Sequence, residues 1–204
     1  ATLIVNTVPG TFDNDSDRNN WYAGASLWTA VDGVPGAHIG ILAPSRRQEN
    51  REFDIGRGTD ERYSRAMRFW GATGAWDYNW EGGVQHGEFE GLQVRAWYFA
   101  SDTGYSLRSH AMAPRFGLRF DATSGDRDPN DNELNTFSSL FASTAYSGLA
   151  GQIGPANAID LAPSISFSPW PNVRLNAGVI GFWRVSQADG IYTTSGGLSR
   201  TGQN

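Results

Sequence analysis

Five arginines and three carboxylates stand where they could bind ions on one face of a β-sheet. The arginines are Arg95, Arg115, Arg119, Arg174 and Arg184, and the carboxylates are Asp77, Glu81 and Asp121. We assign each to the polar side of an extended strand, because polar and apolar residues alternate around it. A guanidinium can donate two parallel hydrogen bonds to a carboxylate, so such a row could bind an acidic ligand. Alternatively, the arginines pair with these carboxylates and with Asp160 across neighbouring strands, and the sequence leaves both interpretations open.

The basic residues are unusual because all 16 are arginine and none is lysine. A GC-rich genome would explain this composition, and so would a requirement for permanently charged, fork-shaped groups that bind carboxylates. The net charge of −5 argues against a general nucleic-acid binder.

The sequence offers little for enzyme chemistry. Glu81, Glu88 and Glu90 could supply the paired carboxylates of glycoside hydrolysis, but alternation places Glu81 on a sheet face and the other two near a turn. The three histidines lack the spacing of metal ligands, and there is no cysteine to bind a metal or form a disulfide. We therefore expect neither an enzyme nor a cofactor.

The stretch from Pro114 to Asp131 gives the clearest indication of the fold. Arg115, Arg119 and Asp121 fall on one side of an extended strand, and Phe116, Leu118 and Phe120 fall on the other. Turn-forming residues and carboxylates follow, so the strand should end in water. A strand that is charged on one face and aromatic on the other needs water on one side and an apolar medium on the other.

Alternating segments of this kind recur and predict eight strands, with a ninth at residues 2–8. The eight are expected at residues 21–30, 37–45, 60–71, 75–87, 91–102, 114–123, 158–168 and 172–185. Segments of about ten residues suit tilted strands that cross a bilayer. Longer polar connections, expected near residues 9–20, 46–59, 124–157 and 186–204, largely alternate with short turns, which is typical of an outer-membrane barrel. The sequence therefore predicts residues 1–204 as one all-β, antiparallel transmembrane barrel segment.

Aromatic residues near the strand ends allow two interpretations. Trp76, Trp80 and Trp97 could belong to the aromatic girdles at a membrane interface. They could instead be stacking platforms of a soluble β-sandwich that binds glycans. The membrane interpretation is favoured because many positions opposite the aromatics are charged or glycine, whereas a sandwich would place Val, Ile and Leu there.

The acidic loops contain two groups with the spacing of calcium ligands. One group is Asp126, Asp128 and Asn130, and the other is Asp13, Asp15 and Asp17. Neither group has the glycine and the distal glutamate of an EF-hand loop, so solvated outer loops are the favoured interpretation. A divalent cation that bridges these loops to lipopolysaccharide is the alternative.

Several segments in this order resemble the alginate-export family of bacterial outer-membrane barrels. They are RFWGATGAWDYNWEGGVQHGEF (68–89), VRAWYFASDTGY (94–105), PRFGLRFDATSGDRDPND (114–131), GPANAIDLAPSISFSP (154–169) and GFWRVSQADGIY (181–192). The resemblance implies a monomeric barrel of about eighteen strands, and this chain would supply eight or nine of them and be truncated at both ends. It also implies a passive pore for an anionic polysaccharide such as alginate, lined by arginines with some carboxylates and gated by loops.

The resemblance also implies where the protein would act and what it would contact. We expect it in the bacterial outer membrane, with an anionic saccharide or small anions inside and lipid or lipopolysaccharide outside. Periplasmic export partners are expected as well, and nucleic acid is not. A general porin for small anionic or other solutes is the alternative within transport, and the glycan-binding sandwich is the alternative outside it.

Overall fold

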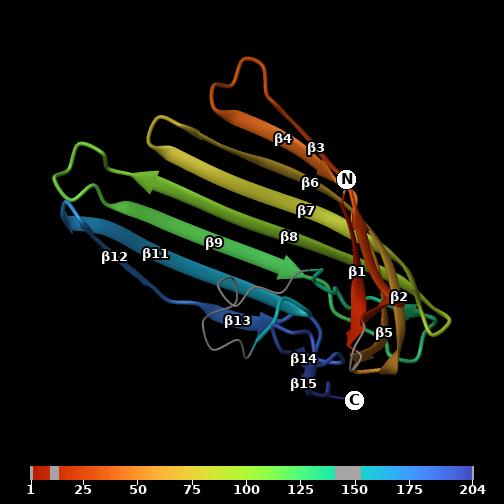
Figure 1. Cartoon of the computed structure of the whole chain (residues 1–204). Coiled ribbons are helices and arrows are strands. Elements are labelled where there is room, and N and C mark those ends of the chain that lie inside the picture. Colours follow the sequence, from red (N-terminus) through yellow and green to blue (C-terminus); the bar gives the residue numbers. More distant parts are fainter. Residues whose placement is uncertain (1, 10–13, 141–152, 204) are drawn as a thin grey trace.

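A curved antiparallel sheet dominates the computed structural model, which describes residues 2–9, 14–140 and 153–203, with side chains described from Asn19 onward in those ranges. The sheet has 13 strands in the order β1-β2-β5-β6-β7-β8-β9-β11-β12, and β3, β4, β10 and β13 attach beside this path. Figure 1 shows tilted strands that lie side by side in a bent, open wall. Every pairing in this sheet is antiparallel except that of β10 with β8.

Six of the described strands each make one crossing of the wall, and three further crossings are each divided between two strands. The strands are β1 (Thr2–Pro9), β2 (Asn14–Gly24), β3 (Ser26–Ala30), β4 (Ala37–Leu42), β5 (Ser45–Phe53), β6 (Gly56–Thr73), β7 (Trp76–Phe89), β8 (Leu92–Ser106), β9 (Arg115–Thr123), β10 (Glu133–Leu134), β11 (Ala158–Trp170), β12 (Val173–Gly178), β13 (Gly181–Arg184), β14 (Ile191–Tyr192) and β15 (Leu198–Arg200). β2 continues into β3, β4 into β5 and β12 into β13. Joined in this way, the described strands make nine crossings.

The prediction of an all-β antiparallel fold is confirmed, and the crossings match the nine expected segments. The open, curved sheet is consistent with part of a barrel. A glycan-binding sandwich is the wrong architecture, because the second sheet contains just β14 and β15 among the described strands. The described residues include no helix with the length and hydropathy needed to span a membrane.

Two of the expected long connections are wrong. Residues 14–20 belong to β2, and residues 46–53 belong to β5, which turns into β6 at residues 54–55. Polarity caused the error, because these segments carry many charged residues. Their backbones nevertheless pair with neighbouring strands, residues 14–17 with β1 and residues 46–53 with β6, which keeps the chain extended.

The connections define two rims. The turn rim carries the connections at residues 31–36, 74–75, 107–114 and 171–172, and the loop rim carries those at 54–55, 90–91, 124–157 and 185–203. Glu90 and Gly91 both have positive φ, 48° and 86°, as a two-residue hairpin turn requires. The loop rim therefore combines tight turns with the two long segments, so long and short connections do not alternate strictly between the rims.

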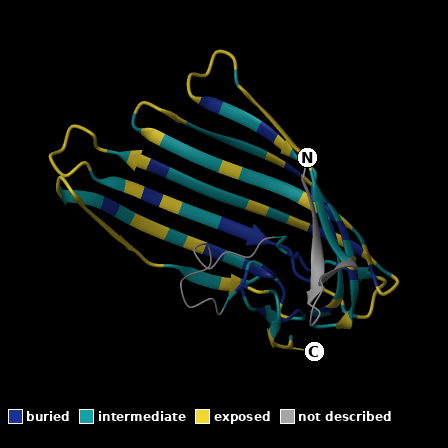
Figure 2. Cartoon of the chain, in the orientation of Figure 1, coloured by how far each residue is buried: buried dark blue, intermediate teal, exposed yellow. Residues whose placement is uncertain are grey.

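The two faces of the wall differ in chemistry. On the convex face, Phe116 and Leu118 are each 49% exposed, and their cross-strand partners Ile165 and Pro163 extend the apolar surface. Polar side chains alternate with them on the concave face. Figure 2 shows that the buried segments gather toward the loop rim. There a small core of Phe53, Phe89, Val94, Leu134, Ala156 and Tyr192 joins the long loops to the concave face.

Candidate functional site

The concave face carries ion pairs at several heights, and Arg115 forms the one nearest the turn rim. Its Nε lies 2.9 Å from Asp77 Oδ2 and its Nη2 lies 2.5 Å from Asp77 Oδ1, so the contact is bidentate. Nη2 also lies 3.2 Å from Asp102 Oδ1. The register brings these groups together, because Asp77 pairs with Gly104 and Gly104 pairs with Gly117 across β7, β8 and β9.

Arg119 forms the next ion-pair group toward the loop rim. Its Nε lies 3.3 Å from Asp121 Oδ2, and its Nη2 lies 3.4 Å from Asp160 Oδ1. Asp121 and Asp160 are direct partners in the β9–β11 register, so both carboxylates share one arginine. The sequence identified all three residues, although it left open whether they brace the wall or bind a ligand.

A third polar group on β6, β7 and β8 contains one expected residue and several unexpected ones. The Tyr98 hydroxyl donates to Glu81 Oε1 at 2.6 Å. Arg68 Nε donates to Asn79 Oδ1 at 2.7 Å, and the Arg68 guanidinium lies 5.0 Å from the Trp70 ring centroid. Sequence reasoning missed Arg68, although its position two residues from Trp70 in an alternating strand could have indicated this face.

The remaining expected arginines are divided between the faces. Arg174 donates to Ser166 Oγ at 3.0 Å, and Arg184 donates to the Asp189 carbonyl at 3.4 Å, both on the concave side. Arg95 does not join them. It is in register with His86 and lies on the convex face, where it pairs with Glu133 at 2.8 Å. Its polarity suggested the concave face. Arg95 and Trp97 are two residues apart on β8, however, so they share one face, and that face is the convex one.

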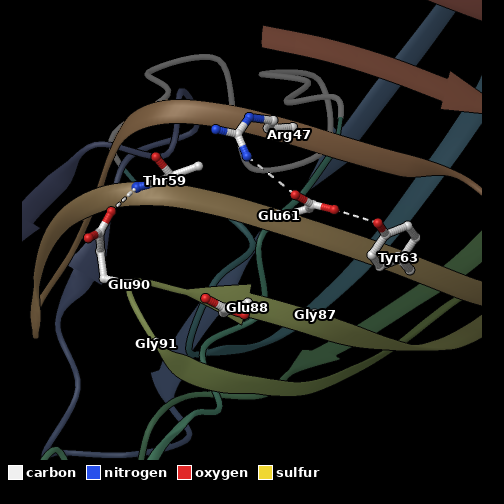
Figure 3. A pocket seen from close by; sticks show the side chains of 8 residues that line it. All are labelled: Arg47, Thr59, Glu61, Tyr63, Gly87, Glu88, Glu90 and Gly91. Carbon is white, nitrogen blue, oxygen red and sulfur yellow. Dashed lines mark hydrogen bonds and ion pairs between the residues drawn. The ribbon is translucent and has the colours of Figure 1, made fainter. Parts of the chain in front are cut away.

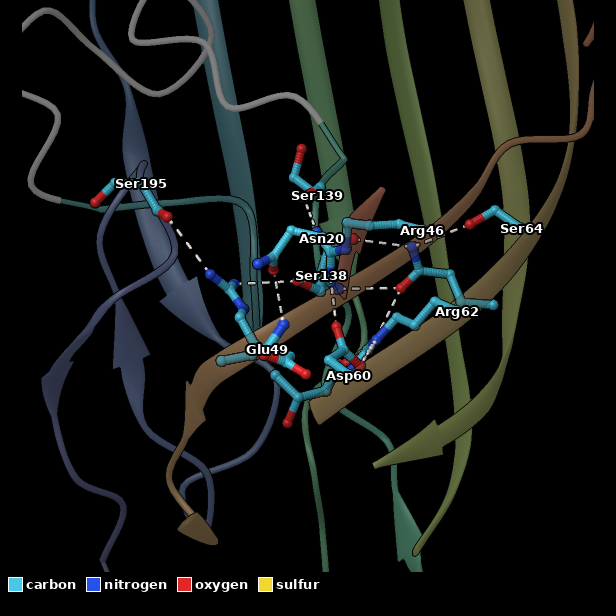
Figure 4. Close-up of polar contacts among 12 residues, drawn as sticks. Asn20, Arg46, Glu49, Asp60, Arg62, Ser64, Ser138, Ser139 and Ser195 are labelled. Carbon is cyan, nitrogen blue, oxygen red and sulfur yellow. Dashed lines mark hydrogen bonds and ion pairs between the residues drawn. The ribbon is translucent and has the colours of Figure 1, made fainter. Parts of the chain in front are cut away.

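The sequence did not predict a buried polar cluster at the loop rim, drawn in Figure 4. Arg46 and Arg62 both bind Asp60, at 2.5 and 2.6 Å, and Asp60 and Arg62 are fully buried. Arg62 also donates to Gln85 Oε1 at 3.0 Å. Ser138, from the loop after β9, accepts from Arg46 at 3.0 Å. The cluster therefore ties the long loop to the concave face of β5, β6 and β7.

The family model for alginate export matches residues 5–204, nearly the whole chain. The chain belongs to the alginate-export family. This family is one of outer-membrane transport barrels, which agrees with the open β-wall and its apolar convex face. Membership supports a role in alginate export and a location in the outer membrane. No curated protein and no solved structure matches the chain.

Within this alginate-export chain, the expected calcium ligands form a series of turns. The amide of Asp128 donates to Asp126 Oδ1 at 3.3 Å, and the amide of Asn130 donates to Asp128 Oδ1 at 3.1 Å. The described residues contain no group of three acidic or histidine side chains that could hold a metal ion. The other expected group lies outside the described side chains. The Asp126–Asn130 series therefore shapes the loop through side-chain contacts to backbone amides.

Asp126 gives this loop a pH dependence that can be measured. Burial, together with the nearby negative charge of Asp189, raises its pKa to about 6. The folded state holds the proton up to about pH 6, so stability from the protonated carboxyl is lost as the pH rises through that value. We expect Asp126→Asn to remove this loss, which is at most about 3 kcal/mol. The check is thermal unfolding in detergent from pH 4 to 8; parallel curves for variant and wild type would contradict the assignment.

The pocket in Figure 3 lies on the convex side near the loop rim and bears on catalysis. Its volume is about 520 Å³, and its lining includes Glu61, Glu88 and Glu90. Glu88 is on the convex face whereas Glu81 is on the concave face, so these two carboxylates do not face one substrate. Glu90 accepts from the Thr59 amide at 2.6 Å, which fixes it to the turn. The sheet therefore separates Glu81 from Glu88 and Glu90, so the three carboxylates considered for glycoside hydrolysis do not form one site.

Proposed function

We propose that this chain forms part of the wall of a passive outer-membrane pore that conducts an anionic polysaccharide such as alginate. The concave face would be the lumen, and it would act without energy coupling, a redox cofactor or enzyme chemistry. Guanidinium groups along the path would exchange contacts with successive carboxylates of the cargo. Each contact would be weak enough to release because an arginine in the wall already has a carboxylate partner.

The observation that carries this proposal is the alternation of charge on the concave face. Arg115 lies between Asp77 and Asp102, and Arg119 lies between Asp121 and Asp160. These partners hold the guanidiniums rigidly in the wall, while 24% of the Arg115 side chain remains exposed to an incoming carboxylate. The two interpretations of the arginines, bracing and binding, are therefore compatible.

Release from proteoliposomes tests the proposal. Vesicles that contain the protein are loaded with oligouronates or with neutral oligosaccharides of the same length, and release is followed over time. We expect the acidic oligomers to leave faster than the neutral ones. Equal rates would favour a general porin, and release no faster than from protein-free vesicles would refute the pore.

The orientation of the wall can be tested separately at Leu118. This side chain lies in the middle of the convex apolar face and is 49% exposed. We expect Leu118→Arg to destabilise the protein in lipid vesicles by about 2–4 kcal/mol, because a charge would then face hydrocarbon. Asn176→Arg, on the concave face of β12, is the matched control and should cost far less. Equal losses in urea unfolding would contradict the assigned orientation.

A further inference from the structure

Three arginines crowd together beneath the long loops at the loop rim. Arg46 is 8% exposed, Arg51 is 9% exposed and Arg62 is fully buried. The hydroxyl of Ser138 joins two of them, accepting from Arg46 at 3.0 Å and from Arg51 at 3.1 Å. Asp60 binds Arg46 and Arg62, and among the described side chains it is the one carboxylate paired with this group.

The charge of this cluster is not balanced by its described partners. Three guanidiniums face one carboxylate, whereas Arg115 alone has two. Each of the three also has a buried nitrogen without a hydrogen-bond partner: Nε of Arg46, Nε of Arg51 and one Nη of Arg62. Buried charge and buried unpaired donors are costly, so the cluster favours a further negative group.

The chain positions Arg51 in this cluster by a specific device. The β5–β6 register shifts by one residue between Gln48 and Arg51, with Asn50 at φ 57°. This bulge turns Arg51 to the same face as Arg46, whereas uninterrupted alternation would have turned it outward. Gly196, at φ 82°, lies so close that a Cβ there would meet the Arg51 guanidinium nitrogens at 2.2 and 2.3 Å. The bulge and the glycine together admit a guanidinium that a regular strand would exclude.

A small pocket lies directly beside two of these arginines, Arg46 and Arg51. Its volume is about 190 Å³, and its lining includes Arg46, Arg51, Ser139, Thr194 and Ser195. At roughly 30 Å³ per water, the space would hold about six waters or one compact anion with fewer. Guanidiniums and hydroxyls can both donate hydrogen bonds to an oxyanion.

We propose that this pocket binds one compact oxyanion, a carboxylate or a phosphate group. The anion links β5 to the loop segments that carry Ser139 and Ser195, and it compensates the excess charge of Arg46, Arg51 and Arg62. Two kinds of molecule carry such an oxyanion: the saccharide, through the carboxylate of a uronate, and free inorganic phosphate. The site needs no conduction through the lumen, so it goes beyond the proposed function and can fail independently of it.

Thermal unfolding in detergent tests the site, with sodium phosphate compared against sodium chloride at equal ionic strength. Glucuronate and an oligouronate are tested in the same way. We expect phosphate or uronate to raise the unfolding midpoint of the wild type by several degrees. Arg51→Gln should abolish that rise and weaken binding at least tenfold in calorimetric titration. Arg57→Gln is the control, because Arg57 lies on the adjacent strand with 62% of its side chain exposed and pairs with Glu52.

The outcomes distinguish the two sources of the anion from each other, and they also show whether the site exists. If phosphate raises the unfolding midpoint and uronates do not, the site holds a resident inorganic anion. If uronates raise the midpoint and phosphate reduces their effect, the site binds the cargo. If neither anion binds the wild-type protein, the proposal is wrong, whatever the conduction assay gives. It is equally wrong if Arg51→Gln and Arg57→Gln respond alike. Should Arg51→Gln fail to fold, Arg51→Lys replaces it as the test variant, because it keeps the positive charge. Calorimetric titration of the wild type still decides whether the anion binds.

Discussion

Replacing Asp60 by Asn is expected to destabilise the protein by about 3–5 kcal/mol, because it leaves buried arginines without their carboxylate. Asp60 is fully buried and binds Arg46 at 2.5 Å and Arg62 at 2.6 Å. The loss should first release the loop that Ser138 anchors, since that hydroxyl accepts from Arg46, one of the two arginines that Asp60 binds. Urea unfolding in detergent, followed by tryptophan fluorescence, measures the effect.

Glu52→Gln is the matched control for this substitution. Glu52 is also a carboxylate of the β5–β6 hairpin that pairs with an arginine, but its side chain is 41% exposed and its partner Arg57 is 62% exposed. Exposed pairs contribute about 0–1 kcal/mol, so this variant should stay close to the wild type. A similar small effect for Asp60→Asn would show that the buried cluster does not hold the loop in place.

Replacing Arg115 by Ala is expected to shift the pore strongly toward cations. The arginine is the shared partner of Asp77 and Asp102, so its removal changes the local charge from −1 to −2. A unit charge about 10 Å from a passing ion in water changes the ion's energy by about 0.4 kcal/mol. That is about twofold for each ion sign, so the anion-to-cation permeability ratio should fall about fourfold. Reversal potentials across a salt gradient in planar bilayers measure it.

Two further variants make this prediction specific. Asp77→Asn should move the reversal potential in the opposite direction, because it removes a negative charge from the same group. Arg95→Ala should leave it nearly unchanged, because Arg95 lies on the convex face and pairs with Glu133. If Arg95→Ala and Arg115→Ala shift the potential equally, the assignment of the concave face to the lumen is wrong.

Alternation along the chain was enough to predict most of the wall. The stretch from Arg115 to Thr123 is a strand with Phe116, Leu118 and Phe120 on the convex face, as expected. Strands were harder to predict from the sequence where both of their faces are polar. The β5 strand illustrates this, because its many charged residues give it the composition of a loop. Its backbone pairing with β6 shows that it is a strand.

The candidate site could be predicted in part. Alternation found Arg115, Arg119, Asp77 and Asp121. The Arg115–Asp77 contact follows from cross-strand register, and the Arg119–Asp121 contact joins two residues of one strand that share a face. It misplaced Arg95, because polarity alone does not decide which side of a strand faces inward. It missed Arg51, because the polar segment 46–59 was expected to be a connection, and a one-residue bulge also reverses the alternation there. It also missed the partners that the loop supplies, such as Ser138, because contacts between residues so far apart leave no local pattern.

Single-channel recording with oligouronates tests the central claim most directly. The protein is placed in a planar bilayer, and oligouronates or neutral oligosaccharides of equal length are added to one side. The account predicts anion-favouring conductance that oligouronates interrupt and neutral oligomers do not. It also predicts that Arg115→Ala combined with Arg119→Ala shortens these interruptions. Equal block by both oligomers, or no block by oligouronates, would contradict an arginine-lined path for an anionic polysaccharide.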